Sequence, residues 1–131
     1  MSIIKVLLFS ADEAVAAPLI TCLVAAGYQV IHTSRGYGAI DMIVAEEPAA
    51  VILDISLPDF NSLAIISSLR SMAAGDRVPV ILLGSNLKED DVLLGLEVGA
   101  DLCLLEAFHP QVFIARLRSL LRRYEAIPVN H

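Results

Sequence analysis

The sequence has little of what marks a disulfide-bonded, metal-binding or disordered chain. It has two cysteines, Cys22 and Cys103, and neither lies in a CxxC motif or next to a histidine. We expect both to be reduced, buried thiols. Seven glycines and six prolines are scattered among 131 residues, without a low-complexity tract or an internal repeat. With 56% hydrophobic residues, the chain can bury one core, so we expect one domain over residues 1–124 and a tail or linker start over 125–131.

Formal charge is absent from residues 14–34, and the mean hydropathy is +0.71. Pro18 and His32 interrupt this stretch, and its pattern changes from helical to alternating at Gly27. The stretch therefore predicts a helix, a turn and a buried strand, not a membrane span. The first residues meet Asp12 and Glu13 without a small-residue cleavage pattern, so we expect a cytoplasmic protein without membrane contact.

The sequence lacks a broad cationic surface. Residues 1–110 hold 5 Lys or Arg and 14 Asp or Glu, a net charge of −9, whereas residues 111–131 hold four Arg and one Glu, a net charge of +3. Strong binding to nucleic acid needs a wide basic face, so no direct nucleic-acid binding is expected. An acidic body with a basic last helix suits self-association.

Apolar runs of strand length alternate with helical stretches, which predicts a parallel sheet with helices on both faces. The expected strands are 3–9, 29–33, 50–53, 80–83 and 101–105. The expected helices are 14–26, 37–46, 62–72, 89–98 and 110–124. Pro18 requires that the first helix start late or bend, and Gly27 and Gly99 are placed to end helices.

In an open parallel sheet, ligands bind at the carboxyl ends of the strands. The residues expected there are Ser10 and Ala11, Asp54, Gly84 and Ser85, and Glu106. Asp54 directly follows the apolar run of residues 51–53. These side chains are therefore expected to lie close together.

Six stretches match a known family: KVLLF (5–9), GYQV (27–30), VILDISLPD (51–59), VPVILL (78–83), LEVGAD (96–101) and AFHPQVFIARLRSLLRR (107–123). In these the chain resembles the CheY-like receiver domains of bacterial response regulators. The last stretch is similar to the winged-helix, OmpR-type subfamily. The resemblance implies a doubly wound, flavodoxin-like fold with five helices around a five-stranded parallel sheet of order 2-1-3-4-5.

The resemblance also implies a reaction centre, most of which is missing. Family members hold Mg²⁺ with an acidic pair and the acceptor Asp, sense the phosphoryl group with a Thr or Ser, and pair it with a Lys. These positions fall on Ser10 and Ala11, Asp54, Gly84 and Glu106, and only Asp54 matches. We expect no cofactor and only weak Mg²⁺ binding, through Asp54 and the carbonyl of Ser56, because one carboxylate does not compensate dehydration of this ion. Glu106 would add a second carboxylate, and like charges 4 Å apart cost about 4 kcal/mol at an effective dielectric near 20.

Several alternatives stay open on the sequence alone. Asp12 and Glu13 either form a shifted acidic pair or charge the first turn of the following helix. Ser85 either replaces the hydroxyl missing at Gly84 or points away, since strand side chains alternate. Asp54 is either a phosphoacceptor or a strand-end carboxylate that caps backbone amides.

The resulting hypothesis is a pseudo-receiver, not an enzyme, that signals through protein contacts in two-component phosphorelay signalling. The alternatives are a conventional receiver phosphorylated on Asp54 by a histidine kinase, and the regulatory domain of a DNA-binding transcriptional regulator. A homodimer is expected through the last two helices and the strand between them. Its expected contact residues are Asp90, Leu94, Glu97, Asp101, Ile114, Arg116, Arg118 and Arg122.

Overall fold

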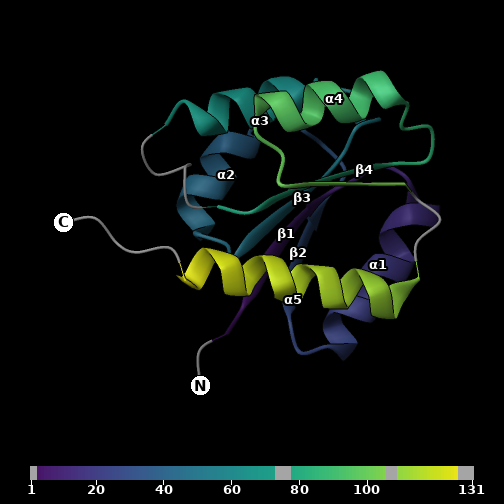
Figure 1. The fold of residues 1–131 in the computed structure, drawn as a ribbon, viewed down its shortest axis with the longest axis vertical. Coiled ribbons are helices and arrows are strands. Elements are labelled where there is room, and N and C mark those ends of the chain that lie inside the picture. The colour runs from purple at the N-terminus through teal and green to yellow at the C-terminus, as the bar shows by residue number, and fades with distance from the viewer. Residues whose placement is uncertain (1–2, 73–77, 106–108, 127–131) are drawn as a thin grey trace.

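A computed structural model describes residues 3–72, 78–105 and 109–126 of the chain. The described residues form a five-stranded parallel sheet of order β2-β1-β3-β4-β5. Figure 1 shows α1 and α5 on one face of this sheet and α2, α3 and α4 on the other. The predicted fold and strand order are confirmed.

All five strands lie where the apolar runs predicted them. Their bounds are β1 Lys5–Phe9, β2 Gln29–Thr33, β3 Ala50–Asp54, β4 Val80–Gly84 and β5 Leu102–Leu105. The first strand begins two residues later than predicted. Ile3 and Ile4 are 75% and 41% exposed and precede the paired register, although the Ile4 carbonyl accepts a hydrogen bond from the N–H of Gln29 at 2.9 Å. The three central strands are buried on both faces, which explains why their sequences are continuously apolar.

The five helices also follow the prediction, with small shifts at their ends. Their bounds are α1 Glu13–Ala25, α2 Ala39–Glu46, α3 Ser62–Arg70, α4 Glu89–Val98 and α5 Pro110–Ala126. Gly27 and Gly99, with φ of 96° and 122°, adopt the positive φ expected after α1 and α4. The last helix continues two residues into the segment predicted as a tail.

The first helix contains Pro18, so it does not start late to avoid this residue. Asp12 precedes the helix, and its Oδ1 accepts a hydrogen bond from the N–H of Ala14 at 3.0 Å. This cap begins the helix one turn before the proline. Pro18 lies on the exposed face of α1, where water can hydrate the backbone carbonyl that the proline leaves without a donor.

The sheet separates two apolar clusters. Leu8, Ile52 and Leu83 pack with α1 and α5, around Phe113. The alternate side chains of the same strands, such as Leu53, point to the other face of the sheet. They pack with α2, with α3 and with the residues next to α4 in the chain, such as Leu87. Each fully buried Leu or Phe side chain contributes about 1.5–3 kcal/mol relative to its exposed state. The two clusters thus fix which helices cover which face.

The two cysteines are half-buried, and neither forms a disulfide. Burial raises the pKa of both the Cys22 and the Cys103 thiol above its ordinary value. Among the described residues, no helix is long and apolar enough to cross a bilayer.

Arg70 at the end of α3 connects elements at the amino-terminal edge of the sheet. Its guanidinium donates hydrogen bonds to the carbonyl oxygens of Val78 at 2.7 Å and Gly99 at 3.0 Å, and to Asp101 Oδ2 at 2.9 Å. The side chains of Arg70 and Asp101 are only 17% and 23% exposed. Such a planar, partly buried pair is stronger than an ion pair in open solvent.

Asp101 also binds β4 and α5. Its Oδ2 accepts a hydrogen bond from the N–H of Val80 at 2.8 Å, and the Tyr124 hydroxyl donates to its two oxygens at 2.7 and 2.8 Å. We call the side chains of Arg70, Asp101 and Tyr124 the basal network. Asp101 was expected to meet an arginine of a second copy. In the structure its carboxylate instead accepts hydrogen bonds from Arg70 and Tyr124 of the same domain.

We predict that Tyr124→Phe destabilises the domain by about 1–2 kcal/mol, because it removes a hydrogen bond to a charged group. Desolvation by burial, followed by the hydrogen bond to Asp101, raises the pKa of Tyr124 from 10 to about 12. The folded state therefore holds this proton more tightly, so the stabilisation is complete below pH 10 and is lost as the pH rises towards 12. Urea unfolding at pH 7 and pH 11 measures both effects.

The matched control for this prediction is Tyr37→Phe, since Tyr37 is 79% exposed and should tolerate the change. Equal stability of the Tyr124→Phe variant and the wild type at pH 7 would contradict the role assigned to the network.

Candidate functional site

Asp54, the last residue of β3, lies buried where the carboxyl ends of β1, β3 and β4 meet. Its side chain is 3% exposed. Oδ2 accepts a hydrogen bond from the Ser10 hydroxyl at 2.9 Å, and Oδ1 accepts one from the N–H of Ser56 at 2.9 Å. Both carboxylate oxygens thus have a donor within the domain, as a buried carboxylate requires.

Ser10 is itself held in place from three directions. Its N–H donates to the Thr33 carbonyl at 3.0 Å, and its hydroxyl oxygen accepts from the N–H of Asp12 at 3.2 Å. His32 Nε2 lies 2.8 Å from the Ser10 carbonyl oxygen, and a carbonyl only accepts, so this nitrogen carries the proton. The hydroxyl is left with one hydrogen to donate, and it is directed at Asp54.

Ser62 also contacts Asp54, through the backbone. The Ser62 hydroxyl, buried at the start of α3, donates to the backbone carbonyl of Asp54. Sequence reasoning missed Ser62 and His32, since no motif relates a serine eight residues after a strand end, or a histidine on the neighbouring strand, to the site.

The other predicted site residues take simpler positions. Ser10 lies beside Asp54 as expected, and Ala11 is exposed. Asp12 caps α1 and Glu13 is its exposed first residue, so the helix-start interpretation of both acids is confirmed. Ser85 is exposed, and the hydrogen bonds described for the Asp54 side chain come from Ser10 and Ser56. Glu106 lies outside the described residues.

Asp59, in the loop after β3, stabilises the structure near the site. The carboxylate of Asp59 accepts hydrogen bonds from the N–H groups of Gly36 at 2.8 Å and Tyr37 at 3.0 Å. The bond from Gly36, with that from Tyr37 and the charge of Arg35, holds the pKa of Asp59 below its ordinary value. This contact ties the loop after β3 to the loop after β2.

The donor set does not fit the divalent ion that the resemblance implies. Among the described residues, no group of three His, Cys, Asp or Glu side chains could hold a metal. Ser56 contacts Asp54 through its N–H, which donates a hydrogen bond to Oδ1 at 2.9 Å. In the same part of the chain, no cation forms an ion pair with Asp54, since the pairs there join Lys5 to Glu46 and Arg70 to Asp101. Among the described residues, the site offers a hydrogen-bonded carboxylate without an ion-paired cation beside it.

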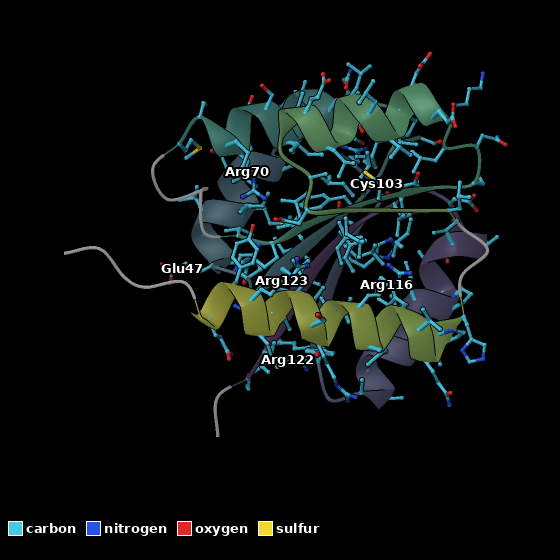
Figure 2. The ribbon with its side chains drawn as sticks, in the orientation of Figure 1. Glu47, Arg70, Cys103, Arg116, Arg122 and Arg123 are labelled. Atoms are coloured by element: carbon cyan, nitrogen blue, oxygen red, sulfur yellow. The ribbon has the colours of Figure 1, made fainter. Side chains whose placement is uncertain are left out.

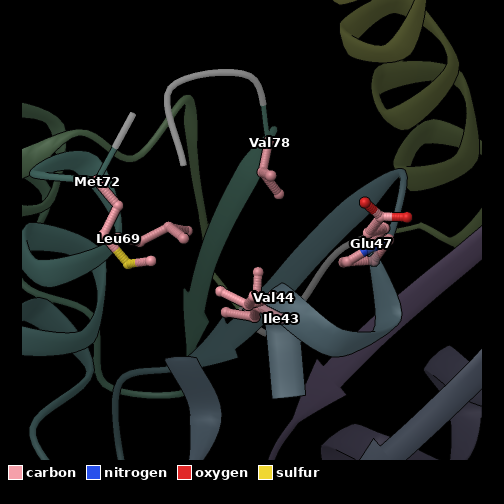
Figure 3. Close-up of a pocket in the computed structure, with 7 residues that line it drawn as sticks. Ile43, Val44, Glu47, Leu69, Met72 and Val78 are labelled. Atoms are coloured by element: carbon pink, nitrogen blue, oxygen red, sulfur yellow. The ribbon is translucent and has the colours of Figure 1, made fainter. Parts of the chain in front are cut away.

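A shallow pocket of about 250 Å³ lies at the opposite, amino-terminal edge of the sheet, between the ends of α2 and α3 (Figure 3). Its described lining is mostly apolar, with Ile43, Leu69 and Val78 among its residues, and Glu47 is the one charged residue in that part. The described lining lacks the convergent polar groups that mark most binding sites, so Asp54 remains the candidate site.

The surface formed by α4, β5 and α5 carries several of the predicted contact residues. On α4, Asp90 and Glu97 are exposed and Leu94 is 47% exposed. On α5, Arg116, Arg118 and Arg122 are exposed, but Arg118 lines a groove with Cys22 and Ala26 on the side of α1. We call this surface the α4–β5–α5 face. Four further apolar side chains, about half exposed, were not anticipated on it: Leu93, Leu96, Leu105 and Val112.

Two predicted contact residues of this face are not available to a partner. Asp101 belongs to the basal network, and Ile114 is only 8% exposed because it packs with α1 in the core. Figure 2 shows Arg116 and Arg123 on the edge of α5 that faces β5, and Arg122 on the opposite edge. The surface arginines nearest β5 are therefore Arg116 and Arg123.

Comparison with known proteins is consistent with this geometry. The sequence pattern described as the response regulator receiver domain matches residues 6–118. The chain belongs to the response regulator receiver family. As a receiver domain it is a part of two-component signalling.

Named relatives of this receiver domain include transcriptional regulators. The chain is 36% identical over 126 residues to the transcriptional regulatory protein GltR of Pseudomonas aeruginosa, and 34% identical over 120 residues to the response regulator MprA of Mycobacterium bovis. These alignments cover 96% and 92% of the chain but only 52% and 51% of the relatives, so it spans about half their length. A putative response regulator from Chloroflexus aurantiacus superposes with a TM-score of 0.87 at 27% identity, over 93% of this chain and all of that one.

We predict that Ser10→Ala destabilises the receiver domain by about 1–3 kcal/mol, because one oxygen of a buried carboxylate loses its donor. The companion variant Asp54→Ala should abolish most of this effect, so a double-mutant cycle should give a favourable coupling of about 1 kcal/mol or more. Urea unfolding of the two single variants and the double variant measures the coupling.

Ser85→Ala is the matched control, since Ser85 is exposed at a neighbouring strand end. Additive effects of Ser10→Ala and Asp54→Ala would show that the two side chains do not interact in solution.

Proposed function

We propose that this receiver domain works with little or no phosphorylation of Asp54 and transmits its signal through protein contacts in the cytoplasm. The observation that carries the proposal is the hydrogen bond from Ser10 Oγ to Asp54 Oδ2 at 2.9 Å. By the family resemblance, Ser10 occupies the place of a metal-binding acid. A hydroxyl there satisfies the carboxylate directly and supplies no charge for Mg²⁺.

The energetics of phosphoryl transfer support the proposal. Asp54 would have to give up a donor in order to attack phosphorus, and the product would carry additional negative charge in a buried place. Receivers offset that charge with a divalent ion and a lysine, whereas the described residues of this chain form no group of three metal ligands and no ion pair with Asp54. Because phosphoryl transfer depends on such electrostatic stabilisation, the bound arrangement of Asp54 favours the unmodified state.

The relatives favour a regulatory role within a larger regulator. GltR is named a transcriptional regulatory protein, and the chain matches about half of it. We propose that the domain regulates an attached or separate output domain, with no direct contact to nucleic acid.

We further propose that the α4–β5–α5 face forms a homodimer. The exposed Leu93, Leu94 and Leu96 of α4 and Val112 of α5 give it an apolar centre. The acids of α4, such as Glu97, and the arginines of α5 bring opposite charges to its two sides. Exposed ion pairs contribute only about 0–1 kcal/mol each, so affinity depends mainly on the apolar area and weakly on salt.

The test of the phosphorylation proposal uses acetyl phosphate with Mg²⁺ and intact-mass measurement. We expect the wild type to stay unmodified on nearly all molecules, and Mg²⁺ titration followed by NMR to show binding at about millimolar concentration or weaker. The triple variant Ser10→Asp, Ala11→Asp and Glu106→Lys is the positive control, since it restores the missing charges. An aspartyl phosphate on most wild-type molecules, absent in Asp54→Asn, would establish the conventional receiver instead.

For the dimer we expect an affinity of about micromolar or weaker that does not require phosphorylation. Leu94→Ser and Arg116→Glu should each weaken it by about tenfold or more, by removing apolar area and by charge reversal. Sedimentation equilibrium at several concentrations measures this. Val24→Ser, at an exposed valine of α1, and Arg35→Glu are the matched controls. A strict monomer at high concentration, or a dimer indifferent to the first two variants, rules out this face.

A further inference from the structure

Gly84, the last residue of β4, is buried and has no space for a side chain. A Cβ added at this residue would lie 2.5 Å from Ile55 Cγ2, much closer than two carbon atoms approach in a packed core. The next neighbours, Ile55 Cβ and Leu87 Cδ1, would lie at 3.7 and 3.9 Å, which are ordinary contacts. Gly84 is not one of the glycines with positive φ. Its backbone would accept other residues, so the restriction comes from the Ile55 methyl group alone.

Ile55 is not free to move away from Gly84. Its N–H donates to the Leu83 carbonyl at 2.8 Å, which continues the pairing of β3 with β4 one residue beyond the strand. Its side chain is half-buried against the cluster that contains Leu53, Leu82 and Leu87. A β-branched side chain has few χ1 rotamers, so moving Cγ2 means repacking the whole residue.

We infer that Ile55 and Gly84 are an interlocked pair that fixes the carboxyl end of β4 and the connection to α4. The inference deepens the proposed function, because residue 84 is where the resemblance places the hydroxyl that senses phosphorylation. The Ile55 methyl group occupies the space that the side chain of any such residue would need. A single substitution at residue 84 therefore does not restore a sensor, and Ile55 has to lose Cγ2 as well.

The pair is placed to influence the α4–β5–α5 face. Leu87, in contact range of both the pair and the core, is 8% exposed and lies two residues before α4. With Ile55 packed against Gly84, the start of α4 is positioned by apolar contact and independently of the charge at Asp54.

The decisive experiment combines Gly84→Ala with two changes at residue 55. Ile55→Leu removes the Cγ2 methyl group on Cβ and keeps the number of carbon atoms, whereas Ile55→Val keeps this methyl group. Alone, Gly84→Ala should lower the folded-to-unfolded ratio by about fivefold to a hundredfold, as overpacking does. Ile55→Leu should recover most of that loss in the double variant, and Ile55→Val should recover little. Urea unfolding measures all five variants against the wild type, with Ser85→Ala as the control for the position.

The outcomes separate clearly. Rescue by leucine and not by valine supports the interlock, and additive effects of Gly84→Ala with both substitutions overturn it. If Gly84→Ala alone does not fold, the two double variants still decide, because only the leucine variant is then expected to fold. None of these measurements involves phosphate. A phosphorylated wild type would thus overturn the proposed function and leave the interlock standing, and additive effects would do the reverse.

A second readout tests the connection to α4. Ile55→Ala opens space beside Gly84, so we expect amide hydrogen exchange to speed up by about tenfold or more over residues 85–94. Exchange in α1 should stay within about twofold of its wild-type rate after correction for global stability. Equal acceleration in α1 and α4 would show that the pair affects stability alone and would overturn its role in positioning α4.

Discussion

The site depends on the burial of one carboxylate at the end of β3. A charged group with 3% exposure needs donors for both of its oxygens, or its desolvation would oppose folding. Ser10 and the N–H of Ser56 supply them, and the neighbouring elements supply the bonds that hold Ser10. In the function that we propose, the same hydrogen bonds that make Asp54 compatible with the core also keep its carboxylate unmodified.

Much of the fold could be read from the sequence, because parallel strands covered on both faces have to be continuously apolar. In a chain of this size, the apolar runs around Leu8, Ile52 and Leu82 are best explained as buried strands. The segments between these runs are long enough for the helices that connect parallel strands. The ends of elements were less accessible. Ile3 and Ile4 were predicted as strand by composition, but they precede the residues that β1 pairs with β2 and β3.

The site could be predicted where a residue could be assigned to a position of the family pattern. Ser10 is an example, because its assigned position places it beside Asp54. It was not predictable where a contact joins residues by tertiary geometry alone. Composition does not show that the Asp101 carboxylate is bound by Arg70 and Tyr124, which are 31 and 23 residues away. Ile114 was expected on the surface as an apolar contact of the homodimer. The position of α1 against α5 decides that this residue is covered.

The basal network shows that the folded domain includes the last turns of α5. The family's shared pattern stops at residue 118, yet Tyr124 supplies two of the contacts to Asp101, six residues further along. The last turns of α5 are thus bonded to the beginning of β5 and, through Arg70, to the end of α3. A fragment cut at residue 118 would keep every strand and still leave the partly buried Asp101 without its tyrosine. The folded unit therefore extends beyond the residues that the family pattern matches.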